Sequence, residues 1–408
     1  MKENLDYENN IYIMVPYFLE KSRRFNFNDI KDSEDKLSKF FLKQFEKISF
    51  YECNNDISTE LKRYFLEKNV LYCFDDKYED EVKSKETINM FLTRHIISNI
   101  CLLTIMIRKN KFSTTQIQDQ VTSNFLYVDN FGEKIFLDEY VYEKYGLRRC
   151  GSGKVLVSLS KMPKDKLEFQ YMLAGESFNS SYSNCLLNSE EILINSGKNF
   201  SQYDFYEIYA GRNSIVYILK NFNNDDMKNI VSEIPILFIM ELVMFQYSSL
   251  LRTNIRIVNE LSYDINVSLN QIEKLYIEFS KTIKFWARDV FKYPTSQILF
   301  DRINKSFEND KILEEYQTNQ RFLEHIVSLR DVQHSNRENK ILNIIVIILT
   351  ILQVIPTIIS IVSWVHKTDY SSYYYSLIQI FGIISLIIIF IISMIKNNRN
   401  KNKKERLN

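Results

Sequence analysis

Two long apolar stretches near the C-terminus dominate the hydrophobic pattern of the chain. Residues 341–365 contain no charged side chain over 25 residues, and residues 376–395 contain none over another 20. A helix rises 1.5 Å per residue, so each stretch is long enough to cross the roughly 30 Å hydrocarbon core of a bilayer. The ten residues between them, 366–375, allow only a tight turn. The pattern predicts two transmembrane helices joined by a short outer loop.

Basic residues flank these stretches on one side. Arg330, Arg337 and Lys340 precede the first, and the tail 396–408 contains six Lys or Arg residues against one acid. Lys and Arg concentrate on the cytoplasmic side of membrane spans. We therefore expect a multi-pass protein of the plasma (inner) membrane with both termini cytoplasmic. The basic tail also suits contact with anionic membrane lipid.

The first span carries a polar stripe. Its members recur at steps of seven residues: Asn336, Asn343, Thr350 and Thr357 form one row, and Gln353 and Ser360 form a second row beside it. Steps of seven keep side chains on one face of a helix. In lipid, such a face must meet protein or water. It either packs helices together in an oligomer or lines a pore. We favour the pore, because the stripe is continuous.

A family resemblance rests on the region that surrounds this span. Ser335-Asn336-Arg337-x-Asn339 precedes the span, Pro356 lies within it, and a short loop leads to the second span. Over roughly residues 295–394 this arrangement resembles the CorA family of divalent-cation channels. The resemblance implies a cytoplasmic α/β domain, a very long stalk helix that becomes the pore-lining span, and a homopentamer with Mg²⁺ as its default ion.

The outer mouth departs from that family. The Gly-Met-Asn signature of CorA proteins, which binds hydrated magnesium, should follow the first span. Placed from Pro356 and Trp364, this site reads Val365-His366-Lys367. A lysine near a pore mouth repels cations. His366 and Lys367 therefore argue against housekeeping magnesium uptake, whereas the channel architecture is unaffected.

The part of the chain before the two spans contains two regions that differ in glycine content. Seven of the eight glycines lie between 132 and 211, which predicts a hairpin-rich region there, whereas the first 131 residues mix strands and helices. Periodicity predicts strands at 11–16, 70–74, 154–161, 168–173, 203–210 and 214–220. It predicts helices at 37–48, 58–68, 85–97, 133–145, 189–195, 225–262 and 266–291, and an unbroken helix from 296 into the first span.

These elements predict an α+β or α/β fold for a sensor-like cytoplasmic domain. We divide the chain into this domain at 1–224, a helical stalk at 225–340, a pore-lining span at 341–365, an outer loop at 366–375, a second span at 376–395 and a basic tail at 396–408. Residues 234–245 are strongly apolar, but Pro235, Glu241 and Gln246 interrupt or bound them. We expect a buried stalk helix there, not a third span.

Composition narrows the function. A formal net charge of +1 gives no electrostatic case for a nucleic-acid polymer as partner. Five scattered cysteines suggest reduced cytosolic thiols, since they lack metal-ligand spacing. The polar N-terminus predicts no signal peptide. No motif for covalent catalysis is visible, so we do not expect an enzyme.

Two clusters are candidates for ligand binding. Gly146–Lys154 is not a Walker A loop, but its glycines and cations can cradle a phosphate of a small nucleotide; an ordinary solvated turn is the alternative. The candidate residues are Arg148, Arg149, Gly151, Gly153 and Lys154, with Arg212 in a second turn. Asp75, Asp76 and Asp80 belong to an acidic run that either holds a regulatory divalent cation, Mg²⁺ or another, or is a solvated loop.

Two functional hypotheses follow. The first is a CorA-like homo-oligomeric channel or transporter, with Mg²⁺ as the default ion. The second is a ligand-gated membrane effector opened by a nucleotide second messenger, because some CorA-like proteins linked to CRISPR antiviral systems are of this kind. A membrane-tethered domain without conduction remains a third interpretation.

Overall fold

The computed structural model describes residues 7–19, 27, 35–53, 55–75, 81–176, 197–223, 225–263, 274, 277, 280 and 290–365. The side chains of residues 55 and 56 and of some helical residues within 259–365 lie outside this description. The chain divides into two compact units, Met1–Leu323 and Glu324–Asn408.

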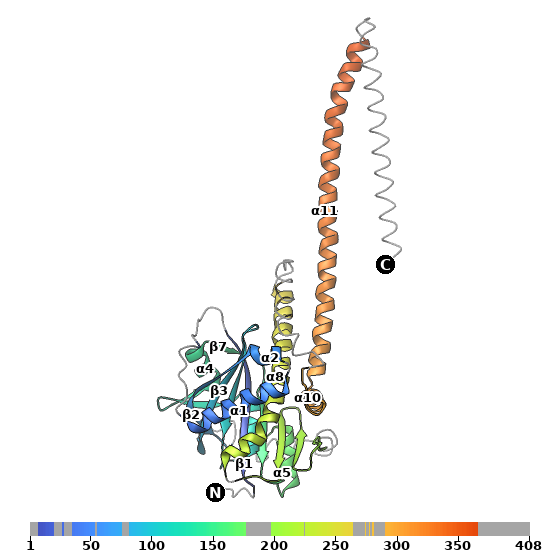
Figure 1. Cartoon of the computed structure of the whole chain (residues 1–408). Coiled ribbons are helices and arrows are strands. Elements are labelled where there is room, and N and C mark those ends of the chain that lie inside the picture. The colour runs from blue at the N-terminus through green and yellow to red at the C-terminus, as the bar shows by residue number, and fades with distance from the viewer. Residues whose placement is uncertain are drawn as a thin grey trace. The chain divides into compact units, whose positions relative to one another are not determined.

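The first unit is built on a mixed sheet of ten strands (Figure 1). The strands are β1 (Asn9–Leu19), β2 (Leu61–Cys73), β3 (Ser84–His95), β4 (Ile100–Ile107), β5 (Tyr127–Asn130), β6 (Glu133–Phe136), β7 (Leu147–Arg149), β8 (Lys154–Leu159), β9 (Tyr206–Ala210) and β10 (Ser214–Leu219). They lie in the order β6-β5-β2-β3-β4-β1-β8-β10-β9, with β7 paired to β1. The β8–β10 pair is parallel and the others are antiparallel.

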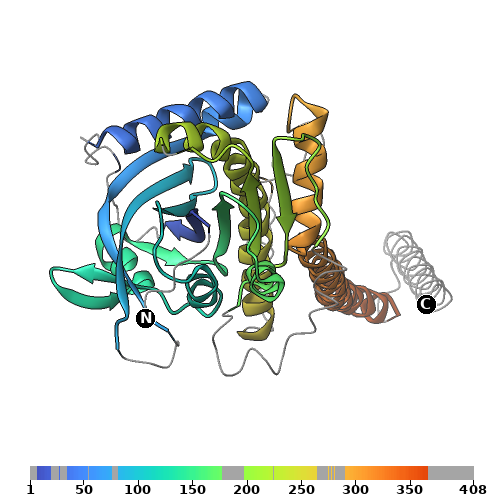
Figure 2. The ribbon, with the colours of Figure 1, turned by 90° about the horizontal axis from the view of Figure 1, so that it is seen from below.

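Helices cover both faces of this sheet (Figure 2). Along β1, Tyr12 and Met14 face one hydrophobic cluster, whereas Ile11 and Ile13 face the other, as the period of two in a strand requires. The first cluster includes side chains of α1 (Lys36–Glu52), α2 (Asn55–Glu60), α8 (Asp226–Tyr263) and α10 (Pro294–Ser306). The second includes side chains of α3 (Thr114–Thr122), α4 (Leu137–Tyr145) and α5 (Lys166–Ala174).

Helix α8 is the most apolar long helix of the first unit. Its segment Asp226–Val258 is long and apolar enough to cross a membrane. Length and composition alone are weak evidence for membrane association. In this molecule 89% of the most apolar window is buried, and the helix contributes to the core over the sheet.

Helix α11 (Asn309–Val365) begins in the first unit and continues into the second. It includes the first predicted span. The outer loop, the second predicted span and the basic tail lie outside the described residues.

Several predicted elements are confirmed. The predictions at 11–16, 37–48, 154–161, 203–210, 214–220 and 225–262 correspond to β1, α1, β8, β9, β10 and α8, and 70–74 is the end of β2. The helix predicted at 133–145 is correct from Leu137 onward and ends, as expected, at Gly146 with φ +66°. Residues 189–195 and most of 266–291 lie outside the described part of the chain.

Five predictions are wrong in whole or in part. Residues 61–68 and 85–95 form β2 and β3 instead of helices, and 133–136 form β6. Residues 168–173 lie in helix α5, whose ends are set by the Asp165 side chain, which accepts from Leu167 N–H, and by Gly175 at φ +75°. The helix predicted to run unbroken from 296 is interrupted at Phe307 and Glu308, between α10 and α11.

Candidate functional site

The two arginines of the predicted phosphate turn lie on β7 and contact helix α4. Arg149 pairs through Nη1 with the Asp138 carboxylate at 3.1 Å and donates through Nε to the Gly151 carbonyl at 2.8 Å. The Arg148 guanidinium lies over the Tyr142 ring, 5.2 Å from its centroid. Both cations therefore have partners within the protein.

Lys154, at the start of β8, lies elsewhere and meets Arg212 instead. Its ammonium donates to the Arg212 carbonyl at 2.7 Å and to Asn213 Oδ1 at 2.9 Å. The rings of Tyr247 and Phe307 also lie within 6 Å of the ammonium. Lys154 is only 3% exposed. Burial, assisted by the nearby Arg212 charge, lowers the pKa of Lys154 to about 8.

The glycines of this turn allow close packing. A Cβ atom on Gly151 would lie 2.6 Å from the Tyr247 ring, and one on Gly153 would lie 2.8 Å from Val121 Cγ1. Tyr247 belongs to α8, and its hydroxyl lies 3.0 Å from Ser152 Oγ. The glycines therefore let α8 and α3 approach the turn, and they need no ligand to explain them.

The turn between α10 and α11 contributes a residue that the sequence analysis did not select. Glu308 has φ +60°, a left-handed conformation that is uncommon outside glycine. Its carboxylate accepts from Arg212 Nε at 3.0 Å and from Lys311 Nζ at 2.5 Å. The hydrogen bond from Lys311, together with the Arg212, Lys311 and Lys154 charges, lowers the pKa of Glu308. Glu308 therefore brings together Arg212 and the start of α11.

Buried residues on both sides of Glu308 anchor the turn between α10 and α11. Phe307 is 2% exposed, and Asn309 is fully buried. Asn309 Nδ2 donates to the Val243 carbonyl of α8 at 3.2 Å and to Asn304 Oδ1 at 2.6 Å. The side chain of Glu308 is thus held at the surface between two anchored residues.

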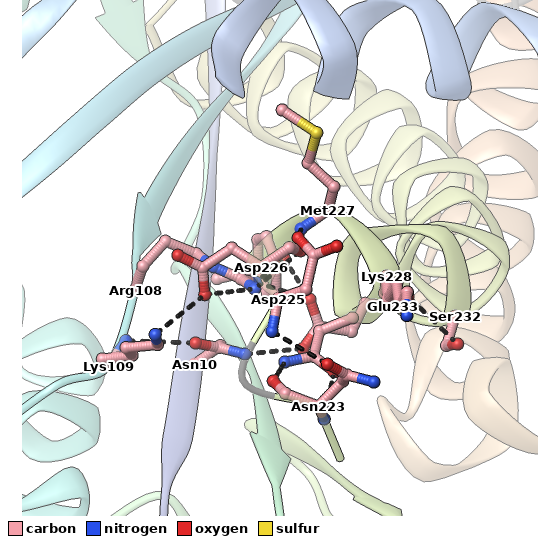
Figure 3. A network of polar contacts seen from close by, with 12 residues as sticks. Asn10, Arg108, Lys109, Asn223, Asp225, Asp226, Met227, Lys228, Ser232 and Glu233 are labelled. Atoms are coloured by element: carbon pink, nitrogen blue, oxygen red, sulfur yellow. Dashed lines mark hydrogen bonds and ion pairs between the residues drawn. The ribbon is translucent and has the colours of Figure 1, made fainter. Parts of the chain in front are cut away.

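A second polar network ties the N-terminal part of α8 to the sheet (Figure 3). The fully buried Glu233 carboxylate accepts from Arg108 Nη1 at 2.6 Å, from the Tyr12 hydroxyl at 2.5 Å and from Asn10 Nδ2 at 2.9 Å. Arg108 also reaches the Asp226 carboxylate at 3.4 Å. Burial raises the pKa of Tyr12 well above its usual value. This network has no unpaired acid that could act as a base, and we assign it to structure.

A third set of polar contacts lies at the β3–β4 turn. Ser98 Oγ is 2.7 Å from His95 Nδ1, and His95 Nε2 is 3.1 Å from Glu60 Oε2. The order of groups resembles that of a catalytic triad. However, Ser98 Oγ also accepts from Ile100 N–H, and the serine closes a turn next to Asn99 at φ +57°. This row of contacts stabilises the turn. His95 is the last residue of β3, whereas the sequence predicted a helix at 85–97.

The polar stripe lies on the observed helix α11. Seven-residue steps on an α-helix drift by only about 20° each, so Asn336, Asn343, Thr350 and Thr357 share a face. Thr350 Oγ1 donates to the Val346 carbonyl one turn earlier at 2.7 Å. Gln353 and Ser360 lie in the same helix, but their side chains are outside the description, as are the outer-mouth residues His366 and Lys367.

The stripe is set in an apolar surface that none of the described residues covers. Ile341, Leu342, Ile344, Ile345, Val346 and Ile347 are all between 45% and 58% exposed. Seven consecutive residues make almost two helical turns, so this exposure extends around the whole helix.

The predicted acidic metal site is described only at its first residue. The Asp75 carboxylate lies 3.4 Å from Lys83 Nζ, whereas Asp76 and Asp80 lie outside the described residues. Within the described ranges, no group of three His, Cys, Asp or Glu side chains could hold a metal ion. Cys53, Cys73, Cys101 and Cys150 are buried free thiols whose pKa burial raises to about 12.

Comparison with known proteins adds no family to this description. No protein-family model matches the chain, and no curated protein and no solved structure is significantly similar to it.

Proposed function

We propose that this chain is a homo-oligomeric membrane ion channel of CorA-like architecture, gated by its sheet domain. In this proposal α11 is the pore-lining helix, residues 376–395 form a second span, and both termini are cytoplasmic. Pentamers follow from the family resemblance alone.

The observation that carries the proposal is the exposed apolar surface of α11. The six apolar residues between Ile341 and Ile347 are exposed around the helix. A helix that is apolar on every side must be covered by lipid or by other protein. The helix from 341 to 365 is long enough to cross a bilayer. A polar stripe on such a helix then faces other copies of α11, because lipid cannot satisfy it.

Ion flux through the full chain in liposomes tests this proposal. Mg²⁺, K⁺ and Cl⁻ are measured separately, because Lys367 at the predicted outer mouth disfavours divalent cations. We expect flux from the natural chain, and a loss of at least about tenfold in the variant Thr350→Leu/Thr357→Leu, since leucine removes the polar stripe. The matched control is Ile344→Leu/Ile358→Leu, which changes apolar positions of the same helix and should retain flux.

The absence of flux for every ion, from a protein that is folded and oligomeric, would contradict the channel and favour a tethered domain. Equal flux from both double variants would contradict the pore-lining assignment.

A second proposal is that a nucleotide second messenger opens the channel. It is supported by Lys154, a buried cation that has only neutral hydrogen-bond partners. The flux assay repeated with a panel of nucleotides tests it: flux that needs no nucleotide contradicts this second proposal without affecting the first.

A further inference from the structure

The buried ammonium of Lys154 has no anion at ion-pair distance among the described residues, although the charge of Glu308 acts on it from farther away. Within the part of the chain that the structure describes, Lys154 forms no ion pair, and its two acceptors are a carbonyl and an amide oxygen. Burying a cation without an anionic partner costs several kcal/mol in typical proteins. Such unbalanced groups gather at functional sites more often than elsewhere.

Two further cations share the carboxylate of Glu308, whose charge acts on Lys154. Arg212 and Lys311 both pair with Glu308, and both of their side chains are 73% exposed. The group therefore contains three cations and one anion, which leaves a surplus of two positive charges. Arg212 and Lys311 are open to solvent, whereas Lys154 is buried.

We propose that Lys154, Arg212 and Lys311 form a binding site for a phosphate-type oxyanion, and that the Glu308 carboxylate occupies this site when the ligand is absent. The incoming anion takes the ion pairs of Glu308 with Arg212 and Lys311, and it gives Lys154 an anion at ion-pair distance. A guanidinium and two ammonium groups suit the several oxygens of a phosphate group. Arg148 and Arg149 are not part of the site, because they contact α4.

Displacement of Glu308 has a structural consequence. The residue is held at φ +60°, and its backbone carbonyl accepts from Lys311 N–H and Ile312 N–H at the start of α11. A non-glycine residue keeps this conformation only when its surroundings impose it. Ligand binding removes the two side-chain contacts that hold Glu308, so the turn between α10 and α11 is the element that responds. Coupling of this response to the pore rests on the proposed channel function; the binding itself does not.

Binding is tested with the full chain in detergent or in nanodiscs of neutral lipid, by calorimetric titration at constant ionic strength. The probes are inorganic phosphate and pyrophosphate. Glu308→Gln removes the internal competitor and should bind pyrophosphate about tenfold more tightly, whereas Arg212→Gln and Lys154→Met should bind it at least about tenfold more weakly. Lys305→Gln removes an exposed cation of α10 outside the site and should bind like the natural chain.

The outcomes separate the alternatives. Equal affinities for Glu308→Gln and the natural chain would overturn the competition by Glu308. A loss of affinity in Lys305→Gln as large as in Arg212→Gln would mean nonspecific attraction to surface charge and would overturn the site. Nanodiscs with anionic lipid distinguish the source of the phosphate group: a lipid ligand should reduce the pyrophosphate affinity of the natural chain, and a soluble ligand should leave it unchanged. Because this experiment measures binding and not ion flux, a negative result would contradict the oxyanion site without contradicting the channel proposal.

Discussion

Helices α8 and α11 have similar apolar stretches but opposite surroundings. In α8, Ile236, Leu237, Met240 and Val243 are at most 3% exposed, whereas Ile341 to Ile347 of α11 are close to half exposed. Length and composition make α8 a candidate membrane span as well. Its burial over the sheet identifies it as a core helix of the first unit instead.

The difference follows from a few polar residues. Helix α8 contains Glu233 and Glu241 eight positions apart, and each is fully desolvated in an ion pair with an arginine of the sheet unit, Arg108 and Arg63. The segment 341–365 contains no acid or base, only amides and hydroxyls. Charged groups can be balanced by partners in a protein core but are expensive in lipid. The kind of polar residue, more than the amount of apolar surface, separates the two helices.

The largest expected effect comes from placing an arginine in each helix. Val243→Arg in α8 buries an unpaired charge, which costs about 5 kcal/mol or more and is comparable with the stability of a whole domain. Ile358→Arg in α11 should leave the sheet domain folded but oppose membrane insertion by about 2–3 kcal/mol. Circular dichroism and carbonate extraction of cell membranes measure the two effects.

The distinction between α8 as a core helix and α11 as a membrane helix would be contradicted by either of two results. In the first, Ile358→Arg unfolds the sheet domain; in the second, Val243→Arg is folded and is merely lost from the membrane fraction. Leucine at the same two positions is the matched control, because it changes shape without adding charge.

The next effect concerns the ion pair of α8. Glu241→Leu leaves the buried Arg63 without its partner, although the ring of Phe45 lies 4.7 Å from the guanidinium. We expect a loss of about 3–5 kcal/mol in the free energy of unfolding. The double variant Arg63→Met/Glu241→Leu should recover most of this loss, because an apolar pair replaces two buried charges.

Urea unfolding of the full chain in detergent measures these values. If the double variant were as unstable as Glu241→Leu, the loss in the free energy of unfolding would come from altered packing. The ion pair with Arg63 would then not explain why Glu241 is tolerated in the buried helix α8.

The hydrophobic pattern was sufficient to predict the elements that consist of one long apolar run. Helix α8 and strands β1, β8 and β10 are long apolar runs, and their predicted bounds lie close to the observed ones. Strand β3 was mistaken for a helix because helices cover both faces of the sheet. Ile88, Met90 and Leu92 enter one core cluster and Phe91 the other, so the strand shows no alternation. Only pairing with β2 and β4 decides its conformation.

The candidate site was predicted only in part. Lys154 and Arg212 were selected from two separate turns, and the structure joins them because β8 and β10 are neighbours in the sheet. Arg148 and Arg149 were selected with them by proximity in sequence, but they contact α4. Glu308 gave no signal: nothing in the sequence marks a glutamate that will adopt φ +60° and end the continuity of a long helix.

A smaller, pH-dependent effect is expected from Lys154, which contacts α8 through the Tyr247 ring. Its pKa falls from 10.5 in a free side chain to about 8 in the folded protein. Between these pH values Lys154 binds one proton more in the unfolded chain than in the folded chain, so its contribution to the free energy of unfolding rises as pH increases, by up to about 3 kcal/mol. Above about pH 9 the four buried thiols act in the opposite direction, because they stay protonated only in the folded chain. Below pH 8 the cost of the buried charge is constant.

Unfolding titrations at several pH values measure this slope. The contribution of Lys154 is the difference between the natural chain and Lys154→Met at each pH, and Lys305→Gln should behave like the natural chain. If this difference did not change between pH 8 and 10.5, the Lys154 ammonium would have a counter-charge in solution.

The smallest effect compares two hydroxyls in the same local geometry. Ser248 in α8 donates to the Met244 carbonyl, and Thr350 in α11 donates to the Val346 carbonyl, each one turn back along its own helix. Because these hydroxyls are satisfied within the helix, Ser248→Ala and Thr350→Val should each change stability by no more than about 0.5 kcal/mol.

Thr350→Val keeps the shape of the side chain and removes only its oxygen. If Thr350 lines a pore, the single-channel conductance of the Thr350→Val variant should fall although the oligomer remains intact. If Thr350 packs helices together, the oligomer of the variant should weaken in detergent while the conductance of each channel stays constant. Single-channel recording, with crosslinking of the same sample, separates the two roles that the polar stripe allows.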